Sequence, residues 1–583
     1  MSAQSGIKGQ ARLLYRYVAP HWPAALGLTI ALLGSIGLQL ISPQIIKGFI
    51  DAAQAQADQR QLVNAALTFL GVGIAIQVLR LITTYLSTDL GFRSTNDLRA
   101  ELARHLMGLD MAFHKERTPG ELIERIDGDV TALSNFFTQF VVRVLGSVIL
   151  ILGVLVMLIR EDWRVGAIMT AFAALALAGL VKFGGVAVAD SNAEREANAE
   201  VFGFIEERLA GMDDIRSNGS AQYTLRRYYE TLRNLYWAAI TAWNKRLLVI
   251  RIAIAMWGVG FTLALALGAT FYLRGLLTIG GVYVLLHYTE ILLDPMEQIS
   301  HQLQDLQKAA AGVQRIGDLF ALSATIRGQG VRSLPDGPLP VGFRDVSFAY
   351  EDGEPVLDRV SFRLEAGRKL GLLGRTGSGK TTLTRLLFRL YDPVSGSIEL
   401  GGADLKSLEP DFVRARVAMV TQDVQLFRAS VRDNLTFFDA HKTDEEIVQV
   451  VQDIGLGDWY AGLEKGLDTE LAPGGNDLSA GQAQLLAFAR VFLVNPSVVV
   501  LDEPSSRLDP ATEKLLERAM SRLLEGRTGI IIAHRLGTVQ KVDDIMIIEN
   551  GQVAEFGARP DLVRDPGSHF SLLLKTGSQE AFA

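Results

Sequence analysis

Apolar positions are distributed unevenly along the 583-residue chain. Long apolar segments fill the part before residue 300, and shorter apolar runs alternate with polar, glycine-containing stretches after it. The long segments lie at about 23–46, 62–88, 138–160, 163–187, 247–273 and 277–298. Each is near or above the roughly 20 residues that a helix needs to cross a bilayer. The pattern predicts six transmembrane helices followed by a domain outside the membrane.

The links between the predicted spans alternate in length. Short links lie at 51–61, 160–163 and 274–280, and long charged links lie at 89–137 and 188–246. The long links carry basic clusters, including Arg93, Arg99 and Arg104 in the first and Arg226, Arg227 and Arg233 in the second. Because cytoplasmic loops are enriched in Lys and Arg, we expect the long links in the cytoplasm. Pro and Gly interrupt helices, so 118–121 and 217–220 are predicted turns at the ends of two helical hairpins.

Two further segments frame the predicted spans. Residues 8–20 form an amphipathic stretch suited to the cytosolic membrane surface. Residues 327–340 contain several Gly and Pro residues, which is typical of a linker. After Val341 short apolar strands alternate with helices, which predicts an α/β domain with a largely parallel sheet. We therefore place a transmembrane domain at 1–325, a linker at 326–340 and the α/β domain at 341–583.

Composition agrees with this division and excludes some kinds of site. Hydrophobic residues make up 49% of the chain beside 21% charged residues, and the mean hydropathy is +0.22. The formal net charge of −7 does not favour nucleic acid as a partner. The sequence contains no Cys. Disulfides, thiolate zinc sites and cysteine nucleophiles are therefore excluded.

Residues 374–381, with the sequence GRTGSGKT, match the phosphate-binding loop pattern GxxxxGK[ST] at every fixed position. The apolar run 369–373 before them predicts a buried strand, and 382–390 predicts an amphipathic helix. In such a loop backbone N–H groups and a helix N-terminus face the phosphates. Lys380 then reaches the β- and γ-phosphates, and Thr381 can bind Mg²⁺. The sequence therefore predicts a site for a nucleoside triphosphate.

A second chemical landmark is the apolar run 497–501, which ends in Asp502 and Glu503. The run predicts a buried strand. At its end Asp502 can hold Mg²⁺ through water, and Glu503 can polarise the water that attacks the γ-phosphate. Acidic residues often end strands, so the pair alone would be a weak indication of a site. The phosphate-binding loop that precedes it in the chain makes the assignment to ATP hydrolysis specific.

From 341 to about 559 the chain resembles the nucleotide-binding domain of ATP-binding cassette (ABC) transporters. The resemblance rests on the two landmarks together with Leu478-Ser479-Ala480-Gly481-Gln482, Thr421-Gln422-Asp423, the segment 506–509 and His534. With six preceding spans the whole chain resembles an exporter-type half-transporter, and 113–130 is similar to the first intracellular loop of that family. The implied fold is a helical membrane domain fused to an α/β P-loop NTPase domain.

The resemblance implies a role for each matching residue. Tyr350 would stack on adenine, Gln422 would sense Mg²⁺ and the γ-phosphate, and His534 would contact the γ-phosphate. Glu503, His534, Gln422 and Lys380 form the expected catalytic set, and Thr381, Gln422 and Asp502 the Mg²⁺ set. The expected nucleotide contacts are Tyr350, Arg375, Thr376, Gly377, Ser378, Gly379, Lys380, Thr381, Thr382, Ser479, Gly481 and Gln482.

The resemblance also implies a reaction and a partner. In this family the signature loop, here 478–482, completes the ATP site of a second subunit. We expect ATP-driven export of a lipid, drug or peptide by alternating access, from an integral membrane protein in the plasma or inner membrane with its nucleotide-binding domain in the cytoplasm. An importer with this architecture and an ATP-gated channel or regulator without net transport are the alternatives. A soluble ATPase is disfavoured by the six spans.

Two positions depart from the family pattern on the side that is donated to the partner. Ala480 replaces the first glycine of LSGGQ, and Pro473 stands where exporters commonly have a glutamate. A methyl group can hinder backbone approach to phosphate, and proline removes an N–H. Because the residues for the chain's own ATP match the pattern, a heterodimer with a different half-transporter is favoured over a homodimer.

The last predicted span carries four polar residues spaced so that they fall near one helical face: His287, Glu290, Asp294 and Glu297. Acids inside a membrane are costly and tend to face water or a partner. This face is expected to line the cavity and favour cationic or zwitterionic groups. The alternatives are pairing to Lys182 or Arg251 and simple exposure near the cytosolic edge of the membrane.

Overall fold

The computed structural model describes residues 15–292, 295–296, 298, 311–328, 330, 333–350, 353–475, 477–502, 510–533 and 536–576. Side chains are not described at 135–142, 181, 184, 510, 511, 536 and 538. The chain divides into two compact units, each described by itself below. The helical unit contains Met1–Met107 and Thr118–Leu322, and the α/β unit contains Gly108–Arg117 and Ser323–Ala583.

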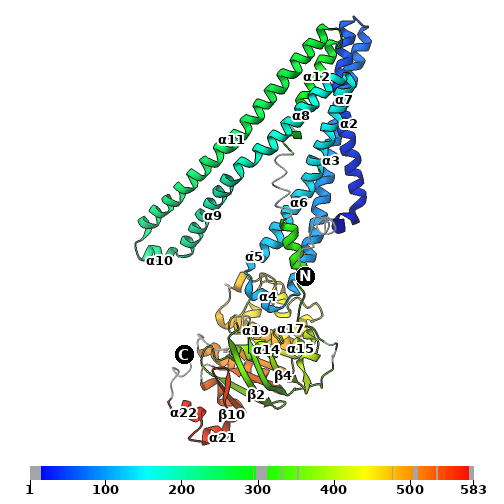
Figure 1. The fold of residues 1–583 in the computed structure, drawn as a ribbon. Helices are drawn as coiled ribbons and strands as arrows, with labels where there is room; N and C mark the ends of the chain where they lie inside the picture. Colours follow the sequence, from blue (N-terminus) through cyan, green and yellow to red (C-terminus); the bar gives the residue numbers. More distant parts are fainter. Residues whose placement is uncertain are drawn as a thin grey trace. The chain divides into compact units, whose positions relative to one another are not determined.

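Long helices form the helical unit. They are α2 (Trp22–Gln54), α3 (Gln59–Met107), α5 (Pro119–Ile123), α6 (Val130–Gln139), α7 (Gly146–Glu161), α8 (Trp163–Gly184), α9 (Val188–Ala210), α10 (Met212–Ser217), α11 (Ala221–Leu273) and α12 (Ile279–Ile291). Two π-helical turns lie on either side of α6: η2 (Glu124–Asp129) separates it from α5, and η3 (Phe140–Leu145) separates it from α7. In Figure 1, α9 runs beside the first part of the longer helix α11.

Five helical stretches among the described residues are long and apolar enough to cross a membrane. They are Tyr15–Gln54, Gln59–Met107, Arg143–Glu161, Trp163–Ala210 and Ala221–Leu273. The first, second, fourth and fifth predicted spans fall within them, and the third, 138–160, begins five residues before Arg143. The sixth, 277–298, begins with the 13-residue α12 and includes residues outside the described ones, so its full length stays a prediction.

The predicted cytosolic extensions are helical, as expected. The helix α3 continues well past its predicted span, and α9 and α11 extend the second hairpin until Gly219, whose φ of 65° ends the run. At the other tip Thr118 caps α5 by accepting a hydrogen bond from the Glu121 N–H at 3.2 Å. The predicted turn at 217–220 is therefore confirmed, whereas at 118–121 the structure has the start of α5, because Pro119 occupies its first turn and Thr118 caps it. Of the predicted surface helix 8–20, only 15–20 lies within the described residues.

The packed centre of the helical unit combines apolar contacts with a few polar links. Val154, Leu158 and Met169 are fully buried there with Tyr288 of α12. The Tyr288 hydroxyl donates a 2.6 Å hydrogen bond to the Leu40 carbonyl, in α2, which satisfies the buried polar group. These contacts link α12 to α2.

The α/β unit contains two sheets. A six-stranded sheet has the order β10-β9-β3-β8-β7-β6, parallel except for the β9/β10 pair. Its strands are β3 (Lys369–Leu373), β6 (Val417–Val420), β7 (Val498–Asp502), β8 (Thr528–Ile532), β9 (Asp544–Glu549) and β10 (Gln552–Ala558). The largely parallel sheet was predicted. The antiparallel sheet beside it, in the order β2-β1-β4-β5, was not.

The second sheet consists of β1 (Val341–Ala349), β2 (Pro355–Leu364), β4 (Ser395–Leu400) and β5 (Ala403–Asp404). Alternate residues of β2 are buried, as in a strand that packs on one face. The main helices of the unit are α4 (Met111–Glu116), α14 (Lys380–Leu387), α15 (Pro410–Arg416), α16 (Val431–Thr436), α17 (Asp444–Asp453), α18 (Gly457–Ala461), α19 (Ala480–Val494), α20 (Pro510–Leu523), α21 (Arg559–Arg564) and α22 (His569–Thr576). Two buried clusters fill the unit, one on each side of the parallel sheet.

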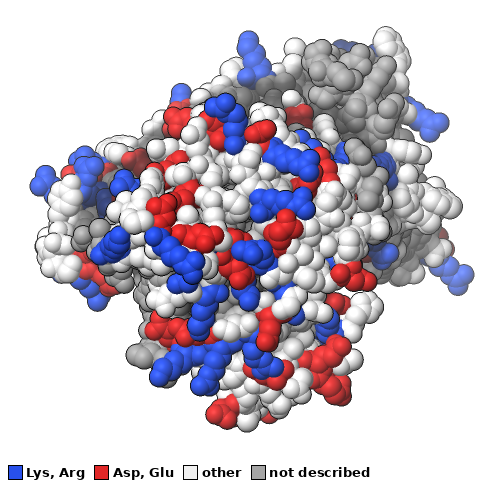
Figure 2. All heavy atoms as spheres, turned by 90° about the horizontal axis from the view of Figure 1, so that it is seen from below, with Lys and Arg blue, Asp and Glu red and all other residues white. Residues whose placement is uncertain are grey.

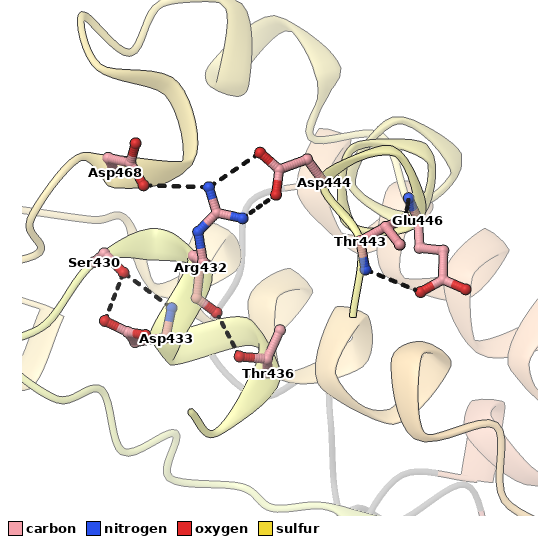
Figure 3. Close-up of polar contacts among 8 residues, drawn as sticks. All are labelled: Ser430, Arg432, Asp433, Thr436, Thr443, Asp444, Glu446 and Asp468. Carbon is pink, nitrogen blue, oxygen red and sulfur yellow. Dashed lines mark hydrogen bonds and ion pairs between the residues drawn. The ribbon is translucent and has the colours of Figure 1, made fainter. Parts of the chain in front are cut away.

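A polar network fixes the helices that pack on α19 (Figure 3). Arg432 of α16 donates to both oxygens of Asp444, at the start of α17, and to Asp468 at 3.2 Å. Ser430 caps α16, and Thr443 and Glu446 form a reciprocal capping box on α17. Hydrogen bonding from Arg432 lowers the pKa of Asp444. Three segments of the chain are thus joined through the guanidinium group of Arg432.

Elsewhere on the surface the charges are mixed. Figure 2 shows basic and acidic side chains interspersed over the face in view. Several form short-range ion pairs between exposed groups, such as Arg414 with Asp411 at 3.3 Å. Pairs of this kind contribute little to stability because water and salt screen them.

Candidate nucleotide-binding site

The parallel sheet brings most of the predicted site to one edge. Residues 374–381 follow the carboxyl end of β3, Gln422 follows β6, and Asp502 ends β7. In the register Leu372 pairs with Ile532, Asp502 with Ile532 and Val420 with Leu501. Because these strands are parallel, their carboxyl ends lie along the same edge. Open parallel sheets bind ligands at this edge.

The loop 374–379 has a backbone that requires its glycines. Gly374, Gly377 and Gly379 have φ values of 152°, 84° and 108°. A Cβ at Gly374 would lie 2.3 Å from the Ile548 carbonyl oxygen, and one at Gly379 would lie 2.6 Å from Leu357 Cδ2. Side chains at these two positions would both strain the backbone and clash. The predicted strand 369–373 is confirmed, and the helix begins at Lys380 rather than at 382.

Lys380 is buried and turned into the loop. Its Nζ donates hydrogen bonds to the carbonyls of Gly374 at 2.6 Å and Arg375 at 2.9 Å. The Lys380 side chain therefore links the end of the loop to its first two residues. A positive charge at the centre of a ring of backbone N–H groups suits a polyphosphate.

Two observations fit this loop to the phosphates of ATP. The Ser378 hydroxyl is buried and has no hydrogen-bond partner, so a phosphate oxygen would satisfy it. The helix α14 has Gly379 at its N-cap and no side-chain cap, which leaves the first N–H groups of the helix for an anion. Arg375, Thr376 and Thr381 are exposed at the loop surface, and Thr382 is buried behind it.

Tyr350 lies directly after β1, and contacts with four residues orient its ring. Its hydroxyl is 3.2 Å from Thr382 Oγ1 and accepts a hydrogen bond from Arg385 at 3.2 Å. The Tyr391 ring meets it edge-on, with centroids 5.3 Å apart. The Lys115 ammonium sits over the ring, 4.0 Å from its centroid. A base that stacks on that face would have to displace Lys115.

Asp502 and Gln422 lie at the sheet edge, where the Mg²⁺ set was predicted. Asp502 is partly buried and Gln422 is exposed. The Gln422 carbonyl accepts a 2.9 Å hydrogen bond from Gln484 of α19, whose Oε1 is buried without a partner. No cluster of three His, Asp or Glu residues that would hold a metal by itself occurs among the described residues. A magnesium ion bound mainly by phosphate and water needs only one or two protein oxygens.

The predicted signature residues sit at the N-terminus of α19. Ser479 and Gln482 form a reciprocal capping box, with 3.2 Å from the Gln482 N–H to Ser479 Oγ and 2.9 Å from the Ser479 N–H to Gln482 Oε1. Gly481 is buried, and a Cβ there would lie 2.1 Å from Thr512 Cγ2 of α20. Ala480 is exposed in the first turn. The structure thus gives Ser479, Gln482 and Gly481 structural roles in this helix, and their contact with nucleotide stays a prediction.

Two predicted catalytic residues, Glu503 and His534, lie outside the described residues, as does the segment 506–509. Their chain positions directly follow β7 and β8 at the site edge. Sequence reasoning missed Lys115, the unpaired Ser378 hydroxyl and Gln484. Nothing in a sequence pattern marks Lys115 as a neighbour of Tyr350, because 235 positions separate them.

Comparison with known proteins agrees with this geometry. The family model for the ABC transporter transmembrane region matches residues 26–296, and the ABC transporter model matches 357–506. The ABC transporter ATP-binding protein YfiC of Bacillus subtilis is 28% identical to the chain, over 97% of this chain and 94% of the relative. The ATP-dependent lipid A-core flippase of Thiobacillus denitrificans is also 28% identical, over 98% and 99%.

Two further similarities are informative. A putative multidrug export ATP-binding/permease protein of Staphylococcus aureus is 27% identical, over 95% of this chain and 97% of the relative. A solved bacterial Atm1-family ABC exporter with ATP bound matches the fold with a TM-score of 0.80 at 23% identity, covering 95% of this chain and 98% of that chain. At that identity the structural match speaks for the fold alone.

The position of Lys380 generates a prediction for nucleotide binding. Lys380→Ala should weaken ATP binding by about tenfold or more, because a hydrogen bond to a charged group contributes roughly 1.5–3 kcal/mol. Binding of a fluorescent ATP analogue to the purified protein measures the change. Lys465→Ala, which removes an exposed lysine of the same unit, is the matched control and should bind like wild type. Equal affinity in Lys380→Ala and wild type would contradict the assignment.

Proposed function

The chain belongs to the ABC transporter family, with the transmembrane region and the nucleotide-binding domain on one polypeptide, and we propose that it exports an amphipathic molecule by hydrolysing ATP as one subunit of a dimer. One observation carries the proposal. The same chain contains five apolar helices of membrane-spanning length and a phosphate-binding loop in which the buried Ser378 hydroxyl has no hydrogen-bond partner.

The names of the relatives support the substrate class. Relatives of nearly full length are named lipid A-core flippase and multidrug export protein. A lipid and an apolar drug share an amphipathic character, and both reach a transporter from the bilayer. We therefore propose a substrate with an apolar portion and a polar group, moved away from the cytoplasmic side.

The residues at the sheet edge support an assignment of the chemical steps. Backbone N–H groups of 374–381 and Lys380 bind the phosphates, and Tyr350 supports the base. Bound Mg²⁺ would neutralise charge on the β- and γ-phosphates, and Thr381, Gln422 and Asp502 are the residues that would hold it. Glu503 would polarise the attacking water, and His534 would contact the γ-phosphate.

The position of α4 supports coupling between ATP hydrolysis and transport. The segment Gly108–Arg117 is part of the α/β unit, although the helices before and after it belong to the helical unit. Asp110 accepts hydrogen bonds from the Thr325 N–H at 2.6 Å and hydroxyl at 2.8 Å. Because α3 ends at Met107, next to this segment, a movement of the α/β unit would displace α4 and would be transmitted along the chain to α3. Such a two-state linkage is what alternating access requires.

The chain has one phosphate-binding loop and one signature loop, so the proposed site is completed by a second subunit. We propose that this subunit is a different half-transporter. Ala480 and Pro473 alter only the part donated to the partner, whereas the loop around Lys380 keeps every fixed position of its pattern. In a heterodimer the altered signature affects one site, and in a homodimer it affects both.

Glu503→Gln gives the direct test of ATP hydrolysis. The amide keeps the size of the side chain and removes the carboxylate, so turnover should fall by roughly 100-fold or more while ATP binding persists. Steady-state phosphate release and binding of a fluorescent ATP analogue measure the two quantities. Glu513→Gln, in α20, is the matched control. An ATPase rate of Glu503→Gln near that of wild type would show that the catalytic assignment is wrong.

The heterodimer proposal predicts what happens when this chain is expressed alone. The protein should show little ATPase activity, and Ala480→Gly should raise the activity severalfold because it removes the methyl group from the donated loop. Light scattering combined with ATPase assays on both forms measures assembly and rate. A stable homodimer with full activity and no response to Ala480→Gly would exclude the asymmetric arrangement.

A further inference from the structure

Lys115 covers one face of the Tyr350 ring, the ring on which adenine is expected to stack. Its ammonium nitrogen lies 4.0 Å from the centre of the ring. This is the shortest contact between a cation and an aromatic ring among the described residues, and the next, between Arg117 and Phe113, is 4.3 Å. The negative face of an aromatic ring attracts a cation. A base can use this face only after a favourable contact has been broken.

The ammonium of Lys115 has no acidic partner. Its neighbour Glu116 pairs with Arg117 at 3.5 Å. No carboxylate lies within ion-pair distance of Lys115 among the described residues. The side chain is exposed to solvent, so burial does not force it against the ring. The described contacts leave the Tyr350 ring as the partner of this charge.

The Tyr350 ring is fixed in place. Its hydroxyl lies 3.2 Å from both Thr382 Oγ1 and the Arg385 guanidinium. Phe348 and Tyr391 pack nearly perpendicular to the ring, with centroids at 4.9 and 5.3 Å. The face under the ammonium therefore stays in one position. A base arriving from water can reach this face, because the side chain that covers it is itself exposed.

A base and the ammonium cannot occupy the same face together. The centroids of stacked aromatic rings lie roughly 4.5 Å or more apart. The ammonium is already 4.0 Å above the Tyr350 ring, so a stacked adenine would overlap its position. The four-carbon stem of lysine is flexible. Lys115 can therefore move aside into water, and the contact with the ring is then lost.

The place of Lys115 in the chain gives this displacement a consequence. Lys115 lies near the end of α4, in the segment Gly108–Arg117 that comes between α3 and α5. Asp110 holds the beginning of this segment on Thr325 through two hydrogen bonds. Loss of the contact with Tyr350 would release the end of α4 while its beginning stays held. Binding of a nucleotide would then alter how the segment is attached, before any bond is hydrolysed.

From these contacts we propose that Lys115 competes with the nucleobase for Tyr350, so that binding of ATP releases the end of α4 from the α/β unit. The proposal rests on the ATP site proposed above and adds a regulation of that site. Without nucleotide the ammonium covers the ring, and with nucleotide the base covers it. The segment between α3 and α5 thus responds to the base of the nucleotide, apart from any contact with its phosphates.

The test compares a ligand that has a base with one that has none. The purified full chain is titrated calorimetrically with the non-hydrolysable β,γ-imido analogue of ATP and, separately, with tripolyphosphate, both in the presence of Mg²⁺. Lys115→Ala should bind the ATP analogue about two- to fivefold more tightly relative to tripolyphosphate than wild type does, because one exposed cation–aromatic contact no longer opposes stacking. The ratio of the two affinities cancels any effect of the lysine charge on phosphates.

Matched variants keep the result specific. Lys115→Gln should raise the ratio as Lys115→Ala does, whereas Lys115→Arg keeps a cation for the ring and should resemble wild type. Lys465→Ala removes an exposed lysine of the same unit and should leave the ratio unchanged. In a Tyr350→Leu background Lys115→Ala should have no effect on the ratio, because the contact is already absent. A ratio that is unchanged or lowered by Lys115→Ala, or raised equally in the Tyr350→Leu background, overturns the proposal.

A label on α4 reports the release itself. The chain contains no Cys, so Glu116→Cys provides a single site for an environment-sensitive dye at the end of α4. The emission of the dye should change when the ATP analogue binds and should stay constant when tripolyphosphate binds. An equal response to the two ligands, or no response to the bound ATP analogue, contradicts release by the base.

Failure of this inference is distinguishable from failure of the proposed function. If wild type bound neither the ATP analogue nor tripolyphosphate, the nucleotide site itself would be contradicted, and the competition with it. Saturable binding of the ATP analogue, with a ratio that Lys115→Ala does not raise, contradicts only the competition.

Discussion

The carboxylate of Asp110 links two segments of the α/β unit that each lie next to a point where the chain passes between its units. Asp110 belongs to the excursion Gly108–Arg117 from the helical unit, and Thr325 follows the last of the three crossings, between Leu322 and Ser323. Two hydrogen bonds, of 2.6 and 2.8 Å, hold these two segments together within the α/β unit. Lys115 of the same excursion lies over the Tyr350 ring. The segment that leads back to the membrane helices thus contacts the residue expected to meet the adenine.

Inside the α/β unit a second set of contacts links the phosphate edge to α19. Gln484 of α19 donates to the Gln422 carbonyl at 2.9 Å. Arg490, further along α19, donates to the Asn434 carbonyl at 2.7 Å, and burial lowers the pKa of Arg490 to about 10, so it stays protonated at neutral pH. Through α16 this bond reaches the network around Arg432 (Figure 3). A displacement of the Gln422 backbone would therefore be transmitted to the signature helix α19 through its hydrogen bond with Gln484.

The sequence predicted the elements whose pattern is strong and local. The apolar spans, the strand 369–373 and the loop with Lys380 follow from hydropathy and from fixed spacing, so the fold class and the phosphate contacts could be predicted. The antiparallel sheet β2-β1-β4-β5 was missed because a strand pattern does not show which strands pair or in which direction, and β1 pairs with both β2 and β4. Contacts between residues that are distant in sequence, such as Lys115 over the Tyr350 ring, leave no mark in the sequence pattern and were missed for this reason.

Packing adds structural roles to residues that were chosen for their motif. A Cβ at Gly481 would meet Thr512, so this position of the helix requires glycine. Ser479 and Gln482 cap their own helix, and their contact with nucleotide stays a prediction. On the last span His287 and Glu290 pair with each other at 3.5 Å, whereas Asp294 and Glu297 lie outside the described residues, so the expected role of this acidic face stays a prediction.

The central claim is that ATP turnover drives transport through the excursion held by Asp110, and the number of substrate molecules moved per ATP tests it most directly. The measurement compares wild type with Asp110→Ala in proteoliposomes, following lipid movement and phosphate release in the same sample. The account predicts that Asp110→Ala hydrolyses ATP but moves severalfold less substrate per ATP, since loss of the carboxylate removes its two short hydrogen bonds. An unchanged ratio of transport to hydrolysis would contradict it.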